Sequence, residues 1–188
     1  MDQNFEALLV RQCAPTLAGL KPASLFCVRS LQPEAARRAA SYWDDRLRPL
    51  GLRVRILLER PETRSALVYV YRPSHLERAL TLAGRRRFLE ESGYRMAGLE
   101  VLLDQLSARL ALQGEFPHEI GLFLGYPLRD VVGFIENQGK NFTCCGMWKS
   151  YGDPTAMGIC FDCFRRCVHA YVRQFEAGVP IERLAVSA

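Results

Sequence analysis

Two runs in which apolar and polar residues alternate, 52–59 and 65–72, constrain the fold of this chain more than any other feature. In the first run Arg53 and Arg55 alternate with apolar residues, which is typical of a strand that buries one face. A short polar stretch that contains Pro61 separates the two runs and has the composition of a hairpin loop. The sequence therefore predicts an antiparallel hairpin.

The rest of the chain alternates between helical patterns and short apolar runs, which predicts an α+β fold with a small, mainly antiparallel sheet. Strands are predicted at 24–29, 52–59 and 65–72, with a further short strand within 142–151. Helices are predicted at 5–17, 33–47, 74–92, 99–112, 117–125, 127–138 and 154–176. Because 188 residues suit one domain, we expect a single unit with a sheet-containing part (1–112) and a helical, cysteine-rich part (113–188).

Two helix starts carry specific capping signals. Ser74 and Glu77 have the spacing of a capping box, in which each side chain satisfies an amide at the helix start. Asp153 followed by Pro154 places a strong N-cap residue before a residue suited to the first helical position. We expect an interruption at Gly84 within the first of these helices.

Composition and charge exclude several classes of protein. The chain is 49% hydrophobic and 24% charged, as in an ordinary globular protein, and no apolar run approaches the ~18 residues of a membrane span. Residues 1–11 lack the basic region of a signal peptide, so we expect a cytoplasmic protein without a membrane partner. The net charge of +5 is concentrated in residues 1–112, whose basic face is interpreted as solvated surface.

Five of the seven cysteines fall within 144–167, which suggests a metal site, although their spacing matches no standard zinc pattern. Cys160, Cys163 and Cys167 lie on one side of a predicted helix. Cys160 and Cys167 are then about 10 Å apart along its axis, so an intact helix cannot bring all three to one ion. Packing at the edge of the core and redox chemistry are the alternatives. The weak metal candidates are Cys144, Cys145, Cys160, Cys163 and Cys167.

The helices at 117–125 and 127–138 resemble a helix-turn-helix pair joined at a glycine. A DNA reader needs basic side chains there, but segment 117–139 holds one Arg against three acids. Nucleic-acid binding is therefore not expected, and the pair serves packing or contact with a partner.

Chemically active side chains concentrate around this pair. At a helix start, His118 would be held neutral as a base or ligand, and Glu119 would be ionised, unless both are simply residues of the first turn. The catalytic candidates are His118, Glu119 and Cys145, and the ligand-binding candidates are Lys140, Asn141, Trp148 and Lys149. Glycines through this region allow close approach of the backbone, so we expect segments 117–121 and 139–149 to meet.

A long series of motifs in this region resembles a bacterial domain-of-unknown-function family, number 3793. The motifs are PHEIG at 117–121, FLGYP at 123–127, GFIENQGKN at 133–141 and CGMWKSY at 145–151. The resemblance implies a cytoplasmic bacterial protein and supplies no mechanism, because the family has no established activity. In the family pattern an aromatic residue is usual at position 147 and the pair Cys160/Cys163 is not typical. This departure weakens any hypothesis that needs the full cysteine cluster and favours His118, Glu119, Lys140, Asn141, Cys145 and Trp148.

Two hypotheses about function follow. In the first, residues 117–149 form a site for a small ligand or a metal, and the residues leave open whether the protein is an enzyme. In the second, the protein is a non-catalytic interaction or regulatory protein that uses the helix pair and the basic N-terminal face. The residues specify no cofactor.

Overall fold

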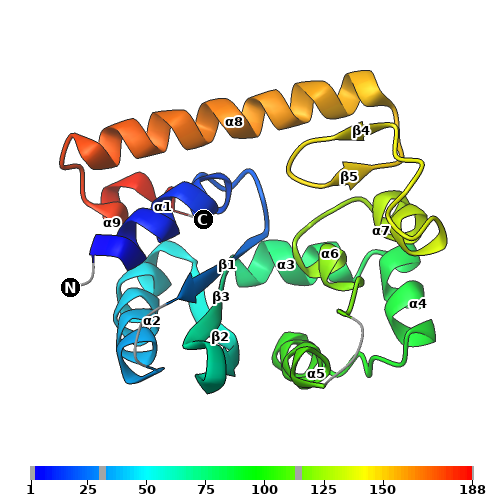
Figure 1. The fold of residues 1–188 in the computed structure, drawn as a ribbon, viewed down its shortest axis with the longest axis horizontal. Coiled ribbons are helices and arrows are strands. Elements are labelled where there is room, and N and C mark those ends of the chain that lie inside the picture. Colours follow the sequence, from blue (N-terminus) through cyan, green and yellow to red (C-terminus); the bar gives the residue numbers. More distant parts are fainter. Residues whose placement is uncertain (1–2, 30–32, 113–115, 188) are drawn as a thin grey trace.

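The computed structural model describes residues 3–29, 33–112 and 116–187, and its architecture is α+β (Figure 1). The helices are α1 (Gln3–Leu17), α2 (Pro33–Leu47), α3 (Pro73–Leu80), α4 (Ala83–Glu91), α5 (Leu99–Ala111), α6 (Ile120–Phe123), α7 (Leu128–Glu136), α8 (Pro154–Glu176) and α9 (Ile181–Leu184). The strands are β1 (Ala23–Arg29), β2 (Arg53–Arg60), β3 (Ser65–Tyr71), β4 (Cys144–Cys145) and β5 (Lys149–Ser150). Short 3₁₀ turns follow α2 (Arg48–Leu50) and β2 (Pro61–Thr63).

The predicted hairpin is confirmed. Strands β2 and β3 pair antiparallel from Arg53–Tyr71 to Arg60–Ser65, and the turn Pro61–Thr63 connects them. The register shifts by one residue at Leu57, which forms a bulge in β2. Strand β1 pairs antiparallel with the other edge of β3, so the sheet order is β1-β3-β2.

The central strand β3 is buried on both faces because its side chains alternate between two cores. Val68 and Val70 contribute to a cluster with α1, α2 and α9, whereas Tyr69 and Tyr71 contribute to a second cluster with α3 to α7. The sheet is therefore sandwiched between two groups of helices. The ring centroids of the two tyrosines lie 5.1 Å apart in a stacked arrangement.

Helix α8 runs along one edge of the molecule, over α1 at its C-terminal end and over the β4–β5 hairpin at its N-terminal end (Figure 1). It begins as predicted, with the Asp153 side chain accepting a hydrogen bond from the Thr155 amide. Met157 and Phe161 are buried near the start, and Tyr171 packs against the first core. One long amphipathic helix thus spans both halves of the fold.

Some expected boundaries are wrong. Helix α3 begins at Pro73, with Arg72 at the N-cap position and no capping side chain, so Ser74 and Glu77 do not form a capping box. The interruption in the following helix lies at 81–82 rather than at Gly84. The fixed φ of Pro73 suits the first helical position and moves the start one residue upstream of the predicted cap.

Two further segments differ from expectation. Helix α6 begins at Ile120, three residues after Pro117, and the preceding residues form a turn. The strand expected within 142–151 is a hairpin of two dipeptide strands, because the turn falls in the middle of that segment. None of the helices in the described ranges is long and apolar enough to span a bilayer.

Candidate ligand-binding site

A cavity of about 500 Å³ lies between the α6–α7 pair and the β4–β5 hairpin. We refer to it as the aromatic cavity, because four aromatic side chains line it: Phe116, Tyr126, Phe134 and Trp148. The polar side chains in its lining are His118, Asp130, Cys145 and Lys149. The remaining lining is mainly aliphatic, and the volume lies in the ordinary range for small-molecule sites.

The β4–β5 hairpin places a thiol and an ammonium group side by side. Cys145 and Lys149 are directly opposite each other in the register, which puts their side chains on the same face. The Nζ of Lys149 donates to the Gly139 carbonyl at 2.8 Å and lies 5.8 Å from the Phe134 ring centroid. Between described residues Lys149 has no carboxylate partner, so its charge is available to a ligand in the cavity.

Trp148 is fixed on three sides. Its ring stacks on Tyr126 with centroids 4.4 Å apart and meets the edge of Phe161 at 4.7 Å. Its indole N–H donates to Oδ2 of Asp130 at 2.8 Å. The aromatic wall of the cavity is therefore held in place before any ligand binds.

Asp130 on α7 is the polar anchor of this wall. Its side chain is fully buried and also accepts hydrogen bonds from the Ser150 hydroxyl at 3.1 Å and the Tyr151 amide at 2.9 Å. Three donors satisfy the buried carboxylate, as the interior requires. Asp130 thus joins α7 to the β4–β5 hairpin and is not free to act on a ligand.

Two glycines permit the close packing behind the cavity. A Cβ atom at Gly133 would lie 2.5 Å from Cγ of Tyr151, and one at Gly146 would lie 2.3 Å from Cδ2 of Phe161. Both distances are shorter than real side chains tolerate, so any larger residue would push the hairpin away from α7 or α8.

His118 lies at the exposed side of the aromatic cavity. Its ring centroid is 4.9 Å from that of Phe134, in a tilted arrangement. The cavity lining includes His118 together with Cys145, Trp148 and Lys149, so segments 117–121 and 139–149 do meet across it. Four of the predicted candidates are therefore brought together by the fold.

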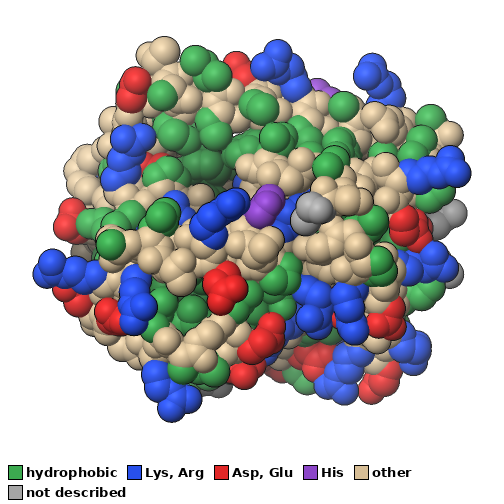
Figure 2. Space-filling model, turned by 180° about the vertical axis from the view of Figure 1, so that it is seen from behind, with side chains coloured by type: hydrophobic (Ala, Val, Ile, Leu, Met, Phe, Trp, Pro, Cys, Tyr) green, Lys and Arg blue, Asp and Glu red, His purple; other side chains and the backbone are tan. Residues whose placement is uncertain are grey.

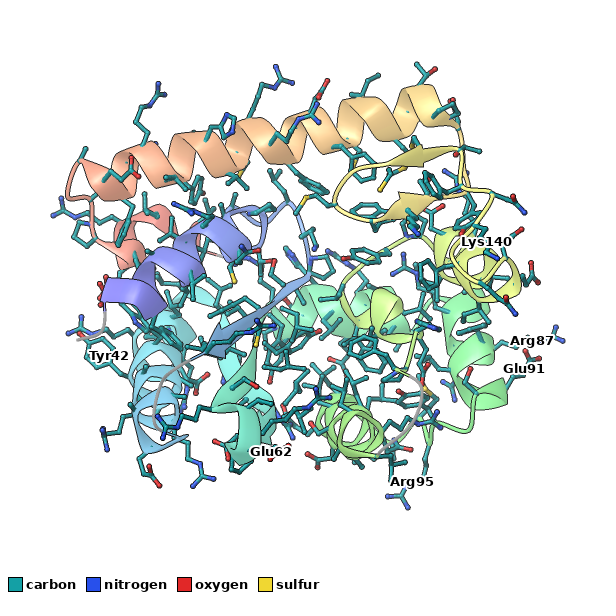
Figure 3. All side chains as sticks on the ribbon, in the orientation of Figure 1. Tyr42, Glu62, Arg87, Glu91, Arg95 and Lys140 are labelled. Atoms are coloured by element: carbon teal, nitrogen blue, oxygen red, sulfur yellow. The ribbon has the colours of Figure 1, made fainter. Side chains whose placement is uncertain are left out.

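Three predicted candidates are not part of the cavity lining. Glu119 turns toward α5, where its carboxylate accepts from Tyr94 and from Arg109, each at 3.1 Å. Lys140 is exposed and points outward from the end of α7 (Figure 3), and the Asn141 amide donates to the Asn137 side chain. Adjacent residues in a helical turn point about 100° apart, which separates Glu119 from His118.

The cysteines do not gather into a metal site. Among residues 3–29, 33–112 and 116–187, no three His, Cys, Asp or Glu side chains are placed to hold a metal ion. All seven cysteines are free thiols. Burial raises the pKa of Cys160 and raises that of Cys167 to about 11, so both stay protonated and apolar near neutral pH. The weak metal candidates Cys144, Cys145, Cys160, Cys163 and Cys167 thus lie on β4 and along α8 without a common centre.

The helix pair offers little surface to nucleic acid. All four residues of α6, from Ile120 to Phe123, are buried. In α7 Asp130 is buried and Arg129 is the basic residue, so the helix presents no basic face.

Among the aromatic and charged members of the lining, sequence reasoning missed Phe116, Tyr126, Asp130 and Phe134. The aromatic residues read as ordinary core or loop positions. Only Asp130 could have been recognised from the sequence, because it is an acidic residue on the apolar face of α7, beside Val131. An acid on such a face must be paired when buried.

These features place the chain in a class of α+β proteins with a preformed aromatic cavity between a helix pair and a small hairpin. The chain belongs to the family described as "Protein of unknown function (DUF3793)", which it matches over residues 9–185. No curated protein and no solved structure matches it.

Proposed function

We propose that the protein binds a flat, largely apolar small molecule that carries one acidic group, and that the aromatic cavity is the binding site. The observation that carries this proposal is the convergence of four aromatic rings with Lys149 and His118 around about 500 Å³. Aromatic walls favour a planar ligand by stacking and apolar burial. A cation at the rim favours a carboxylate or sulfonate on that ligand.

Charge supports an acidic ligand over a basic one. Asp130 is the carboxylate in the lining, and its oxygens already accept from three donors of the protein. Lys149 donates to a backbone carbonyl, which leaves its charge uncompensated by the described residues. A positively charged ligand would be repelled by Lys149 and would find no carboxylate in the lining that is free to accept a hydrogen bond.

Cys145 adds a thiol to the rim, but within the described residues its Sγ makes no hydrogen bond to a base. We therefore propose binding rather than catalysis. We also place the protein in the bacterial cytoplasm, which is supported by the family resemblance and by seven free thiols, a state typical of a reducing compartment.

Titration with 8-anilinonaphthalene-1-sulfonate tests the site, because this probe combines a planar ring system with one anionic group. Trp148 reports binding when Trp43, the other tryptophan, is replaced by Phe. We expect quenching of Trp148 and a Kd that rises about 10-fold in Lys149→Met, the loss of one charge-assisted contact.

The matched control is Lys140→Met, which removes the same charge from an exposed lysine outside the cavity (Figure 3). It should change the Kd less than about twofold. Circular dichroism of both variants checks the fold. Equal weakening by both substitutions, or enhanced probe fluorescence without quenching of Trp148, would place the probe elsewhere and contradict the proposal.

A further inference from the structure

A second cavity, of about 450 Å³, lies on the opposite side of the Gly125–Tyr126 segment, between the loop that follows α1 and helices α3 and α4. We refer to it as the basic cavity. Its ionisable side chains are Lys21, His75, Arg78 and Arg85, and its lining contains no Asp or Glu.

The positive charges of the basic cavity are uncompensated. Within the described part of the chain, the side chains of Lys21, Arg78 and Arg85 form no ion pair and no hydrogen bond. In contrast, the next two residues of α4 are both paired, Arg86 with Glu90 and Arg87 with Glu91. On α4, the arginines outside the cavity are therefore paired with nearby acidic residues, whereas Arg85 inside it is not.

Burial disfavours the charged forms of the ionisable groups in this cavity, and His75 also lies near positive charges. Burial and the nearby charges of Arg72 and Arg78 lower the pKa of His75. Burial also lowers the pKa of Arg85, and that of Lys21 to about 8, so the lysine remains mostly protonated at neutral pH. An anion in the cavity would relieve each of these unfavourable effects.

Apolar side chains stand at the edge of the basic cavity. Leu20 and Leu82 are 49% and 56% exposed and belong to its lining. The volume exceeds that of a single phosphate group, so it leaves room for an organic part against these leucines. Figure 2 shows Lys and Arg side chains beside hydrophobic side chains on the face that it draws, so the two kinds of side chain are mixed on this surface.

From this arrangement we infer that the basic cavity binds the phosphate group of a phosphorylated organic molecule, with Arg78, Arg85 and Lys21 as its ligands. Arginine binds phosphate through paired, charge-assisted hydrogen bonds, and lysine binds it as a point charge. This site is separate from the aromatic cavity and does not depend on the function proposed for that cavity. The phosphate could be carried by a soluble metabolite or by a lipid headgroup, which share this chemistry.

Isothermal titration with inorganic pyrophosphate at fixed ionic strength tests the site. We expect binding by the wild type, and a Kd at least about 10-fold higher in Arg78→Gln/Arg85→Gln, because charged contacts to the anion are lost. The matched control is Arg86→Gln/Arg87→Gln, which lowers the net charge by the same amount on paired residues. Figure 3 shows Arg87 and Glu91 together on the outer side of α4.

The control should bind pyrophosphate within about twofold of wild type, since exposed paired charges contribute little. Thermal unfolding checks that both double variants are folded, and the single variant Arg78→Gln, at an exposed position, provides a second measurement. No binding by the wild type, or equal weakening in the two double variants, would overturn the inference.

Flotation with vesicles that contain phosphatidic acid distinguishes the two sources of phosphate. Flotation that requires Arg78 and Arg85 identifies a lipid headgroup. Binding of pyrophosphate without flotation identifies a soluble phosphorylated molecule. Flotation that is equally reduced by the Arg86/Arg87 control would indicate general surface charge and count against the site.

Discussion

At the scale of single residues, Lys21 occupies the least ordinary environment for its type. Its side chain is only 7% exposed, and its Nζ lies 5.2 Å from the ring centroid of Tyr126. The ionisable neighbours that act on it are the thiols of Cys13 and Cys160. Burial lowers its pKa from 10.5 to about 8, because the charged form loses water without gaining a carboxylate.

This lowered pKa predicts a specific dependence of stability on pH. Between pH 8 and 10.5 the unfolded chain keeps the Lys21 proton while the folded chain releases it, so the unfolded state binds more protons and stability rises with pH. Relative to Lys21→Met, the wild type should gain up to about 3 kcal/mol of unfolding free energy across this window. Urea denaturation at several pH values, in phosphate-free buffer, measures the difference.

Burial also raises the pKa of Cys13, so this thiol destabilises the fold as the pH increases above 9. The comparison of wild type with Lys21→Met cancels this contribution. Cys13 is present in both proteins. A constant difference between wild type and variant from pH 8 to 10.5 would show that Lys21 is solvated like a surface lysine.

The chemical type of several site residues was readable from the sequence, but their partners were not. His118 and Glu119 are adjacent, yet one lines the aromatic cavity and the other pairs with Arg109. The direction of each side chain depends on which helix packs beside the turn, and that is a property of the tertiary fold. The same limit hid Asp130, whose three donors come from a hairpin about 20 residues away.

At the scale of elements, two helical glycines allow a matched test of the packing behind the aromatic cavity. Gly133→Ala in α7 should lower the free energy of unfolding by about 1–3 kcal/mol, because the new methyl group would overlap the Tyr151 ring. Gly158→Ala in α8 meets nothing within 4 Å, so the same change should raise stability by about 0.5–1 kcal/mol through helix propensity.

Chemical denaturation of the two glycine variants measures both effects. A stabilising Gly133→Ala would mean that α7 and the β4–β5 hairpin are not in close contact. The indole fluorescence of Trp148 should shift in Gly133→Ala but not in Gly158→Ala, because only the former displaces the hairpin.

Elements with strong local signals were predictable, and elements defined by distant pairing were not. Alternation predicted β2 and β3, and Asp153-Pro154 predicted where α8 begins. The pairing of β1 with β3 joins residues more than 35 positions apart, and nothing local specifies it. The dipeptide strands β4 and β5 are too short for any period to appear.

At the scale of the whole molecule, the two cavities share one wall. Gly125 belongs to the lining of the basic cavity, and the next residue, Tyr126, lines the aromatic cavity and stacks on Trp148. The Nζ of Lys21, which lines the basic cavity, lies over the Tyr126 ring at 5.2 Å from its centroid. The loop after α1 therefore supports both sites.

Arg72, at the end of β3, connects segments that are distant in the sequence. The residue is 1% exposed, and its guanidinium donates to the carbonyls of Thr16, Leu17 and Val186 at 2.6–2.8 Å. It thereby holds the end of α1 and the segment after α9 against the sheet. Arginine suits this role because its planar group offers five donors.

Arg72→Met should therefore lower the free energy of unfolding by about 3 kcal/mol or more, since several buried carbonyls lose their donor. The control Arg38→Met, at an exposed position of α2, should change this free energy by less than about 0.5 kcal/mol.

Urea denaturation followed separately by the fluorescence of Trp43, in the first core, and of Trp148, beside the aromatic cavity, gives the measurement. If the chain is one domain, both tryptophans should report the same lowered midpoint in Arg72→Met. A midpoint that falls for Trp43 while Trp148 keeps its wild-type value would show two units that unfold independently, and Arg72 would then stabilise only the part built on α1.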